Sequence, residues 1–270
     1  MPSDSNQIAS QYQGYKQTPA LWFKSDLMGI SQFLIPKNIS GTFIKTLPKN
    51  LRLGKRVEQF VFNELEQNTA ISILVENSQI QDNKQTIGEL DAIITNNETS
   101  IHLEIIYKFY VYDESVGHSE IDHFIGPNRK DSLLEKLTKL KNKQLPLLYK
   151  PQTQSLIQSL KLDVNEILQK VCFKAQLFLP YKKDVTIKLL NPDCVVGFYL
   201  KIEELSEFKS SSFYFPSKPD WLIQPHNSVS WLHFQDAEAH FNAIEIEKKS
   251  ACCWIKQADS SIKKCFVVWW

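Results

Sequence analysis

Two neighbouring stretches decide the fold of this chain: GELDAI at residues 88–93 and HLEIIYKFYV at residues 102–111. Both are rich in β-branched, aromatic and other apolar residues, which favours strands. Asn96 and Asn97 lie between them and signal a turn. A third apolar run lies just upstream, and the short connections predict an antiparallel meander. The expected strands cover residues 70–76, 85–95 and 100–112.

The apolar residues follow a helical period before these strands and again after them. Val57, Phe60, Val61 and Leu65 form one apolar stripe, which predicts a helix over residues 54–67. The order helix, three strands, helix, strand then predicts an α/β core, with a central mixed sheet flanked by helices. The further elements expected are helices over residues 129–144, 152–169 and 236–248, and strands over residues 171–180 and 194–201.

The chain is expected to divide into three parts. Residues 1–50 would form an amino-terminal arm with short helices, residues 51–205 the core, and residues 206–270 a mixed carboxy-terminal extension packed on that core. Residues 1–17 are rich in Ser, Gln and Asn, a composition that predicts a loose arm.

Composition limits the classes of protein to which this chain can belong. The 270 residues carry 31 Lys+Arg against 30 Asp+Glu, so coating of nucleic acid by bulk positive charge is excluded. The five cysteines are odd in number and form no CxxC pair, which predicts a reduced chain without disulfides. No stretch approaches the roughly 20 apolar residues of a membrane span. We therefore expect a soluble, cytoplasmic protein.

The two deciding strands also carry charged residues that could bind a metal ion or take part in catalysis. Side chains alternate faces along a strand, so Glu89 and Asp91 share one face, and Glu104 and Lys108 share a face of the next strand. Antiparallel strands lie about 4.8 Å apart, so Asp91 and Glu104 could hold one divalent cation between them. Their oxygen atoms suit Mg²⁺ or Mn²⁺. Glu58, at the edge of the helix's apolar stripe, could add a third carboxylate.

A simpler interpretation of these charges is the solvated face of a sheet, where polar and apolar residues alternate. The neighbours of the charges weaken it. Leu90 and Ala92 flank Asp91, and further apolar residues surround Glu104 and Lys108. Strands of this kind are buried on both faces, and a buried charge needs a partner or a metal ion.

On these residues the chain resembles the catalytic core of the PD-(D/E)XK nuclease superfamily, also called the restriction-endonuclease-like fold. More closely, it resembles the bacterial domain-of-unknown-function family 1853, which is grouped with those nucleases. The resemblance covers most of the chain and rests on seven segments. They are LGKRVEQF (53–60), GELDAI (88–93), HLEIIYKFYV (102–111), FIGPNRKDSLLEKL (124–137), KQLPLL (143–148), KAQLFLP (174–180) and DWLIQP (220–225).

The resemblance implies a metal-dependent nuclease that hydrolyses phosphodiester bonds. Asp91, Glu104 and Glu58 would be metal ligands, Lys108 the catalytic lysine, and Gln144 the glutamine that some members place on the helix after the strands. Two features depart from the superfamily pattern. The usual Glu-x-Lys is stretched to Glu-x-x-x-Lys, and no proline precedes Asp91.

A nucleic-acid partner, DNA foremost, is suggested by an uneven charge distribution. Residues 126–150 hold seven basic and two acidic residues, and such cations commonly contact phosphates. The residues expected to do so are Arg129, Lys130, Lys136 and Lys143, although a solvated helix face explains the same pattern. A catalytically inactive nuclease fold that binds nucleic acid or a protein remains the alternative function. Substrate type and oligomeric state stay open.

Overall fold

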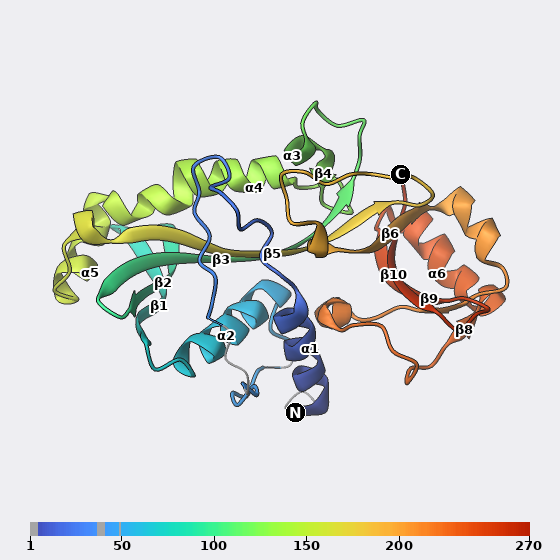
Figure 1. Ribbon diagram of the computed structural model, residues 1–270, viewed down its shortest axis with the longest axis horizontal. Helices are drawn as coiled ribbons and strands as arrows, with labels where there is room; N and C mark the ends of the chain where they lie inside the picture. Colours follow the sequence, from blue (N-terminus) through green and yellow to red (C-terminus); the bar gives the residue numbers. More distant parts are fainter. Residues whose placement is uncertain (1–4, 37–40, 49) are drawn as a thin grey trace. The chain divides into compact units, whose positions relative to one another are not determined.

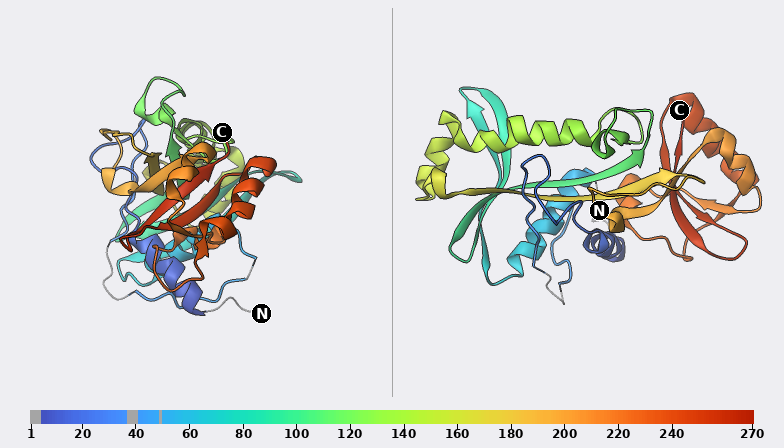
Figure 2. Two further views of the ribbon diagram at one scale, coloured as in Figure 1. Left: turned by 90° about the vertical axis from the view of Figure 1, so that its right-hand side faces the viewer. Right: turned by 45° about the horizontal axis from the view of Figure 1, so that its top comes forward.

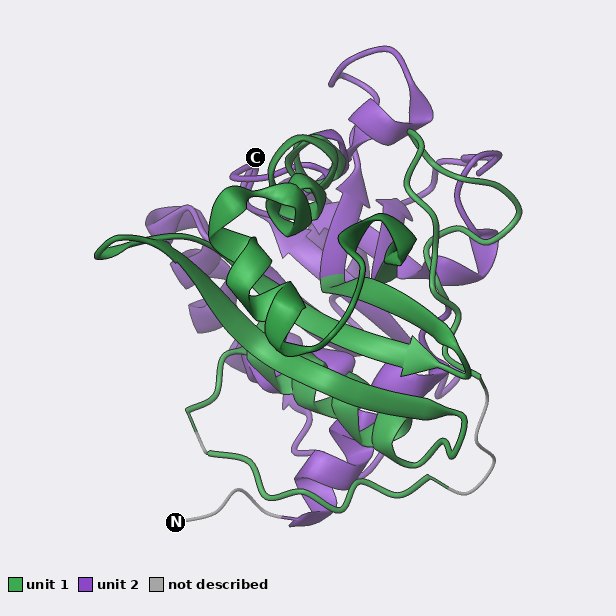
Figure 3. Cartoon of the chain, turned by 90° about the vertical axis from the view of Figure 1, so that its left-hand side faces the viewer, with its two compact units in different colours: residues 1–3, 20–107, 135–174 green, residues 4–19, 108–134, 175–270 purple. Residues whose placement is uncertain are grey.

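The computed structural model describes residues 5–36, 41–48 and 50–270. They form two compact units that are interleaved along the chain (Figure 3). Among these residues, unit 1 falls within 20–107 and 135–174, and unit 2 comprises 5–19, 108–134 and 175–270. The predicted division of the chain at residues 50 and 205 stays a prediction.

Unit 1 begins with the expected helix and antiparallel meander. Helix α2 (Leu53–Glu66) buries its apolar stripe and packs against the first strand. Strands β1 (Ile71–Asp82), β2 (Gln85–Asn96) and β3 (Thr99–Tyr112) pair antiparallel in chain order, and β3 continues into unit 2. Asn97 adopts the left-handed conformation (φ 52°) in the β2–β3 turn. The prediction of three meandering strands is therefore confirmed.

The helical segment after β3 differs from the prediction. Helix α4 (Leu133–Lys139) starts four residues later than expected, because Gly126–Asp131 form a turn closed by a backbone hydrogen bond. It continues as a π-helical turn, η1 (Leu140–Gln144), and a 3₁₀ helix, η2 (Leu145–Tyr149). The helix expected over residues 152–169 is wrong in length. It shrinks to η3 (Pro151–Thr153) and α5 (Gln154–Ser159), since Lys161 turns left-handed (φ 57°).

The two faces of the β1–β2 pair have different neighbours in unit 1. Helix α2 lies on one side and the helical run containing η2 on the other (Figure 1). On the η2 side, the apolar residues Ile80, Leu90, Ile93, Leu147, Leu148, Ile157 and Ile167 form one buried cluster. Gly88 serves this packing, because a Cβ there would lie 2.6 Å from Cδ2 of Leu147. After η4 (Val164–Glu166), strand β5 (Leu168–Pro180) completes the unit and continues into unit 2.

Unit 2 contains the remaining strands in a mixed arrangement. From β5 the order is β6 (Val195–Lys201), β10 (Ile262–Val268), β9 (Ala251–Lys256), β7 (Ser212–Tyr214) and β8 (Leu232–His233). The β5–β6 and β6–β10 pairs are parallel and the others antiparallel. Helix α6 (Phe234–Glu247) lies beside these strands (Figure 2). Its residues Phe241 and Ile244 share a buried apolar cluster with residues of β9 and β10. The fold class is therefore mixed α/β, as predicted.

The short elements of unit 2 lie between these strands. They are α3 (Glu120–His123), β4 (Phe124–Ile125), η5 (Pro192–Cys194), η6 (Ile202–Phe208) and η7 (Lys218–Leu222). Strand β4 pairs antiparallel with β3. No helix among the described residues is long and apolar enough to cross a membrane. All five cysteines are free thiols in buried positions.

The amino-terminal arm is not loose from residue 5 onward. Residues Ser5–Gln17 form helix α1, which buries Tyr12 and Tyr15, while residues 1–4 lie outside the described part. The side-chain amides of Gln7 and Gln11 donate to the buried Asp220 carboxylate. The prediction of a loose arm is wrong because these glutamines satisfy a buried charge, which a composition argument cannot reveal.

Lys264 on β10 is a buried cation in unit 2. Its side chain is 2% exposed, and its ammonium donates to Oε1 of Gln176 (3.0 Å) and to the carbonyl oxygen of Trp221 (2.8 Å). Burial lowers the pKa of Lys264 to about 8. Between this value and 10.5, the unfolded chain binds a proton that the folded chain does not.

We predict that replacing Lys264 with Met removes this pH dependence of stability. The wild type should gain stability as the pH rises from 7.5 to 9.5, by roughly 2 kcal/mol relative to Lys264→Met. Urea unfolding at both pH values measures the difference. The exposed neighbour Lys263 provides the matched control Lys263→Met, which should follow the wild type. Parallel pH curves for Lys264→Met and wild type would contradict the prediction.

Candidate metal centre

The β2–β3 pair brings the two predicted carboxylates together. Ala92 lies opposite Leu103 in this antiparallel register, so the next pair in line is Asp91 and Glu104. The backbone N–H of Ile105 donates to Oδ2 of Asp91 at 2.9 Å. The antiparallel pairing of β2 with β3 is as expected. The sharing of one cation by Asp91 and Glu104 stays a prediction, because the described carboxylates that converge are those of Glu58, Glu89 and Asp91.

Helix α2 adds Glu58 to this pair of strands. One carboxylate oxygen each from Glu58, Glu89 and Asp91 lies within 4.8 Å of the others, close enough to share a cation. Glu89 is not among the predicted ligands, although its position two residues before Asp91 places it on the same face of β2. Glu58, Glu89, Asp91 and Glu104 are called the carboxylate cluster below.

The negative charges of the cluster act on one another. Burial, followed by the charge of Glu104, raises the pKa of Asp91 to about 7, while the hydrogen bond from Ile105 opposes this rise. Burial also raises the pKa of Glu58, against the opposing effect of Lys55. Carboxyl groups held together in this way favour either a proton or a metal cation between them. Their oxygen donors fit Mg²⁺ or Mn²⁺ better than zinc.

Glu104 is completely buried and contacts the side chains of His102 and Gln144. His102 Nε2 lies 3.2 Å from its Oε1, and the Gln144 side-chain amide donates to its Oε2. Gln169 in turn contacts Nδ1 of His102, and Lys136 donates to Oε1 of Gln144 at 2.8 Å. The predicted residue Gln144 therefore does meet Glu104. It reaches it from the π-helical turn η1, a type of distortion frequent at functional sites.

A lysine that the sequence did not single out also lies in the cluster. The ammonium group of Lys55 is 2.8 Å from Oε2 of Glu58, donates to Oε1 of Glu89, and donates to Oδ1 of Asn77 at 2.9 Å. Although burial lowers it, these bonds and charges raise the pKa of Lys55 above its usual value. The sequence signal that could have identified Lys55 is its i,i+3 spacing to Glu58 on the predicted helix.

Lys108, the predicted catalytic lysine, has a different partner. It belongs to unit 2, and its ammonium forms an ion pair with Oδ2 of Asp131 at 2.6 Å. Asp131 closes the turn that begins at Gly126, where a Cβ would lie 2.0 Å from Oδ1 of Asp131. In the structure, the charge of Lys108 is thus balanced by Asp131, in the turn formed by residues 126–131, called the GPNRKD segment below.

Arg129, a predicted phosphate contact, belongs to the same turn. Its guanidinium pairs with Asp113 and lies 3.9 Å from the centre of the Trp270 ring. The carbonyl oxygen of Pro127 accepts hydrogen bonds from Trp270 Nε1 and Ser250 Oγ. Structural contacts therefore account for much of the GPNRKD segment. Lys130 and Lys143 are exposed, and Lys136 is half-buried beside Gln144.

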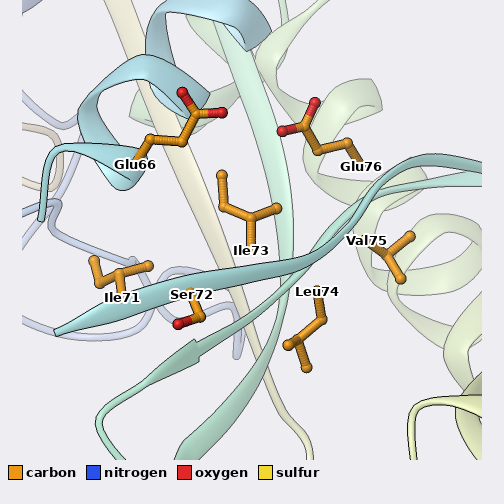
Figure 4. A pocket seen from close by; sticks show the side chains of 7 residues that line it. All are labelled: Glu66, Ile71, Ser72, Ile73, Leu74, Val75 and Glu76. Carbon is orange, nitrogen blue, oxygen red and sulfur yellow. The ribbon is translucent and has the colours of Figure 1, made fainter. Parts of the chain in front are cut away.

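A separate hollow of about 450 Å³ runs along strand β1 (Figure 4). It is lined by Glu66 and Ile71–Glu76, and Leu74 points to the opposite side of the strand from Ile73. The carboxylate of Glu66 is already paired with Lys45 at 2.6 Å. Since the lining contains no residue of the carboxylate cluster, this hollow is not part of the candidate metal centre.

Comparison with known protein families places the chain in a family. The model of a family described as a domain of unknown function (DUF1853) matches residues 40–264. Curated proteins and solved structures yielded no match to the chain.

We predict that Asp91→Asn stabilises the metal-free protein at alkaline pH. The raised pKa means that the folded state binds a proton between about pH 4 and 7 that the unfolded state lacks, so the wild type loses stability as the pH rises through this range. Relative to wild type, Asp91→Asn should gain roughly 2 kcal/mol between pH 5 and pH 8. Urea unfolding in EDTA tests this, with the exposed Asp82→Asn as the control. A gain that is equal at both pH values would refute it.

Proposed function

The chain belongs to the domain-of-unknown-function family DUF1853, and from its carboxylate cluster we propose that it is a metal-dependent nuclease hydrolysing phosphodiester bonds. The observation that carries this proposal is the convergence of Glu58, Glu89 and Asp91 within 4.8 Å, with Glu104 close enough for its charge to act on Asp91. The order α2, β1, β2, β3, α4, β5 supports a restriction-endonuclease-like core of the PD-(D/E)XK type.

The carboxylates would hold the metal ion in this proposal. Glu58, Asp91 and Glu104 would be the ligands, with Glu89 as a further donor. A bound Mg²⁺ would polarise a phosphoryl oxygen and lower the pKa of a water molecule. Glu104 is kept in place by His102 and Gln144, so its carboxylate needs little reorganisation when a cation binds.

Nucleic acid, with DNA as the first choice, would be recognised through its phosphates. Lys143 is exposed one residue before Gln144, and Lys136 donates to that glutamine. Two cations near a side chain that contacts Glu104 would place a phosphate next to the ligands. Lys130 offers an exposed charge in unit 2, whereas Arg129 would have to leave Asp113 or share its charge.

The second candidate is a catalytically inactive nuclease fold that acts as a binding module. Two observations favour it: a lysine occupies the carboxylate cluster, and Lys108 is paired with Asp131. Under this alternative the cluster is a closed set of ion pairs. Nucleic-acid or protein binding would then persist without any hydrolysis.

We predict that purified protein cleaves DNA or RNA in the presence of Mg²⁺ or Mn²⁺ and that Asp91→Ala lowers the rate by on the order of a hundredfold. The physical reason is the loss of a carboxylate that holds the cation. Cleavage of labelled single-stranded and duplex substrates on gels measures the rate. The matched control is Asp82→Ala, which removes an exposed carboxylate at the end of β1.

Equal cleavage by wild type and Asp91→Ala would rule out the nuclease assignment. Binding of nucleic acid without cleavage, unchanged in Asp91→Ala, would favour the inactive alternative. Lys108→Ala tests which lysine, Lys55 or Lys108, takes part in hydrolysis. Loss of cleavage in this variant would support Lys108 as the catalytic lysine.

A further inference from the structure

The ammonium group of Lys55 contacts two members of the carboxylate cluster and one neighbouring amide. An ammonium has three N–H groups, and Lys55 places its own beside Glu58, Glu89 and Asn77. Asn77 takes part from a left-handed position (φ 49°) within β1. The ammonium group is therefore contacted by residues from two strands and a helix, although the side chain of Lys55 is 42% exposed.

The position of Lys55 in its helix is unfavourable for a cation. It is the third residue of α2, where the positive end of the helix dipole disfavours a cation. The neighbouring carboxylates offset that cost. Among the cluster's charges, Oε2 of Glu58 is buried without a hydrogen bond, so the ion pair with Lys55 is its compensation.

We propose that Lys55 is a built-in cation of the carboxylate cluster that competes with a divalent metal ion for Glu58 and Glu89. It also takes the electrostatic role of the catalytic lysine, which the family resemblance implies for Lys108, whose charge is balanced by Asp131. The inference rests on the proposed function for the identity of the ligands. When a divalent ion takes the carboxylates, the released ammonium is available to a phosphate oxygen.

The test is a titration of the metal-free protein with Mn²⁺, followed by electron paramagnetic resonance or calorimetry. Lys55→Met should bind Mn²⁺ roughly three- to tenfold more tightly than wild type, because one competing charge is removed. The matched control is Lys45→Met, which removes a lysine of unit 1 that is ion-paired with Glu66 outside the cluster. It should bind Mn²⁺ as the wild type does.

Equal Mn²⁺ affinity in Lys55→Met and wild type overturns the proposal. If the wild type binds no measurable Mn²⁺, the proposal requires that Lys55→Met gains binding, and absence of binding in both overturns it. Lys55→Gln repeats the measurement with a neutral polar side chain if the Met variant does not fold. In either background, Asp91→Asn should weaken the binding.

The cleavage assay distinguishes this inference from the proposed function. If Lys55→Met gains Mn²⁺ affinity but no variant hydrolyses nucleic acid, the proposed nuclease function is refuted. The proposal that Lys55 competes with the metal ion is then still supported. With hydrolysis in the wild type, Lys55→Met should cleave at least tenfold more slowly at saturating Mn²⁺, and Lys108→Met should cleave more nearly as wild type does. A larger loss in Lys108→Met than in Lys55→Met contradicts the assigned electrostatic role.

Discussion

Repulsion between clustered carboxylates is the constraint on which this site depends. Asp91 and Glu104 are adjacent on paired strands, and Glu58 and Glu89 lie close enough to act on them. Like charges in a low-dielectric environment disfavour one another unless donors or cations compensate. The backbone N–H of Ile105, the side chains around Glu104 and the ammonium of Lys55 supply that compensation. The compensating groups therefore determine whether the cluster is receptive to a metal ion.

Packing on the opposite face of β2 holds the carboxylates in place. Leu90 contributes to the apolar cluster with η2 and α5, whereas the next residue, Asp91, meets Ile105 and the charges of α2. Because side chains alternate, a slip of one residue in β2 would bury Asp91 among leucines and expose Leu90 to the carboxylates. Gly88 admits Leu147 close to the strand and so helps to fix this register. The apolar core thus specifies the geometry of the polar site.

The sequence could predict whatever follows from local periodicity. The apolar stripe of α2, the three strands and the Asn97 turn are periodic or turn signals, and the pairing of Asp91 with Glu104 follows from strand parity. It could not predict partners that depend on tertiary contacts. Lys55 meets Asn77 and Glu89, which lie 22 and 34 residues away, and the glutamines of α1 meet Asp220 more than 200 residues away. The π-helical turn that carries Gln144 has no simple periodic signature.

The contrast between Lys55 and Lys108 shows that the lysine in a family motif need not be the one that contacts the candidate ligands. The GPNRKD segment belongs to one of the stretches that carry the family resemblance, yet it forms a turn whose Asp131 balances Lys108 and whose Arg129 contacts Asp113 and Trp270. Lys55 lies in an ordinary amphipathic helix, and its ammonium contacts two candidate ligands. Lys55 is paired with candidate ligands themselves, whereas Lys108 is paired with a carboxylate outside the carboxylate cluster. The contacts of Lys55 are those that a metal ion would replace, so metal binding would free this charge while leaving the Asp131 pair intact.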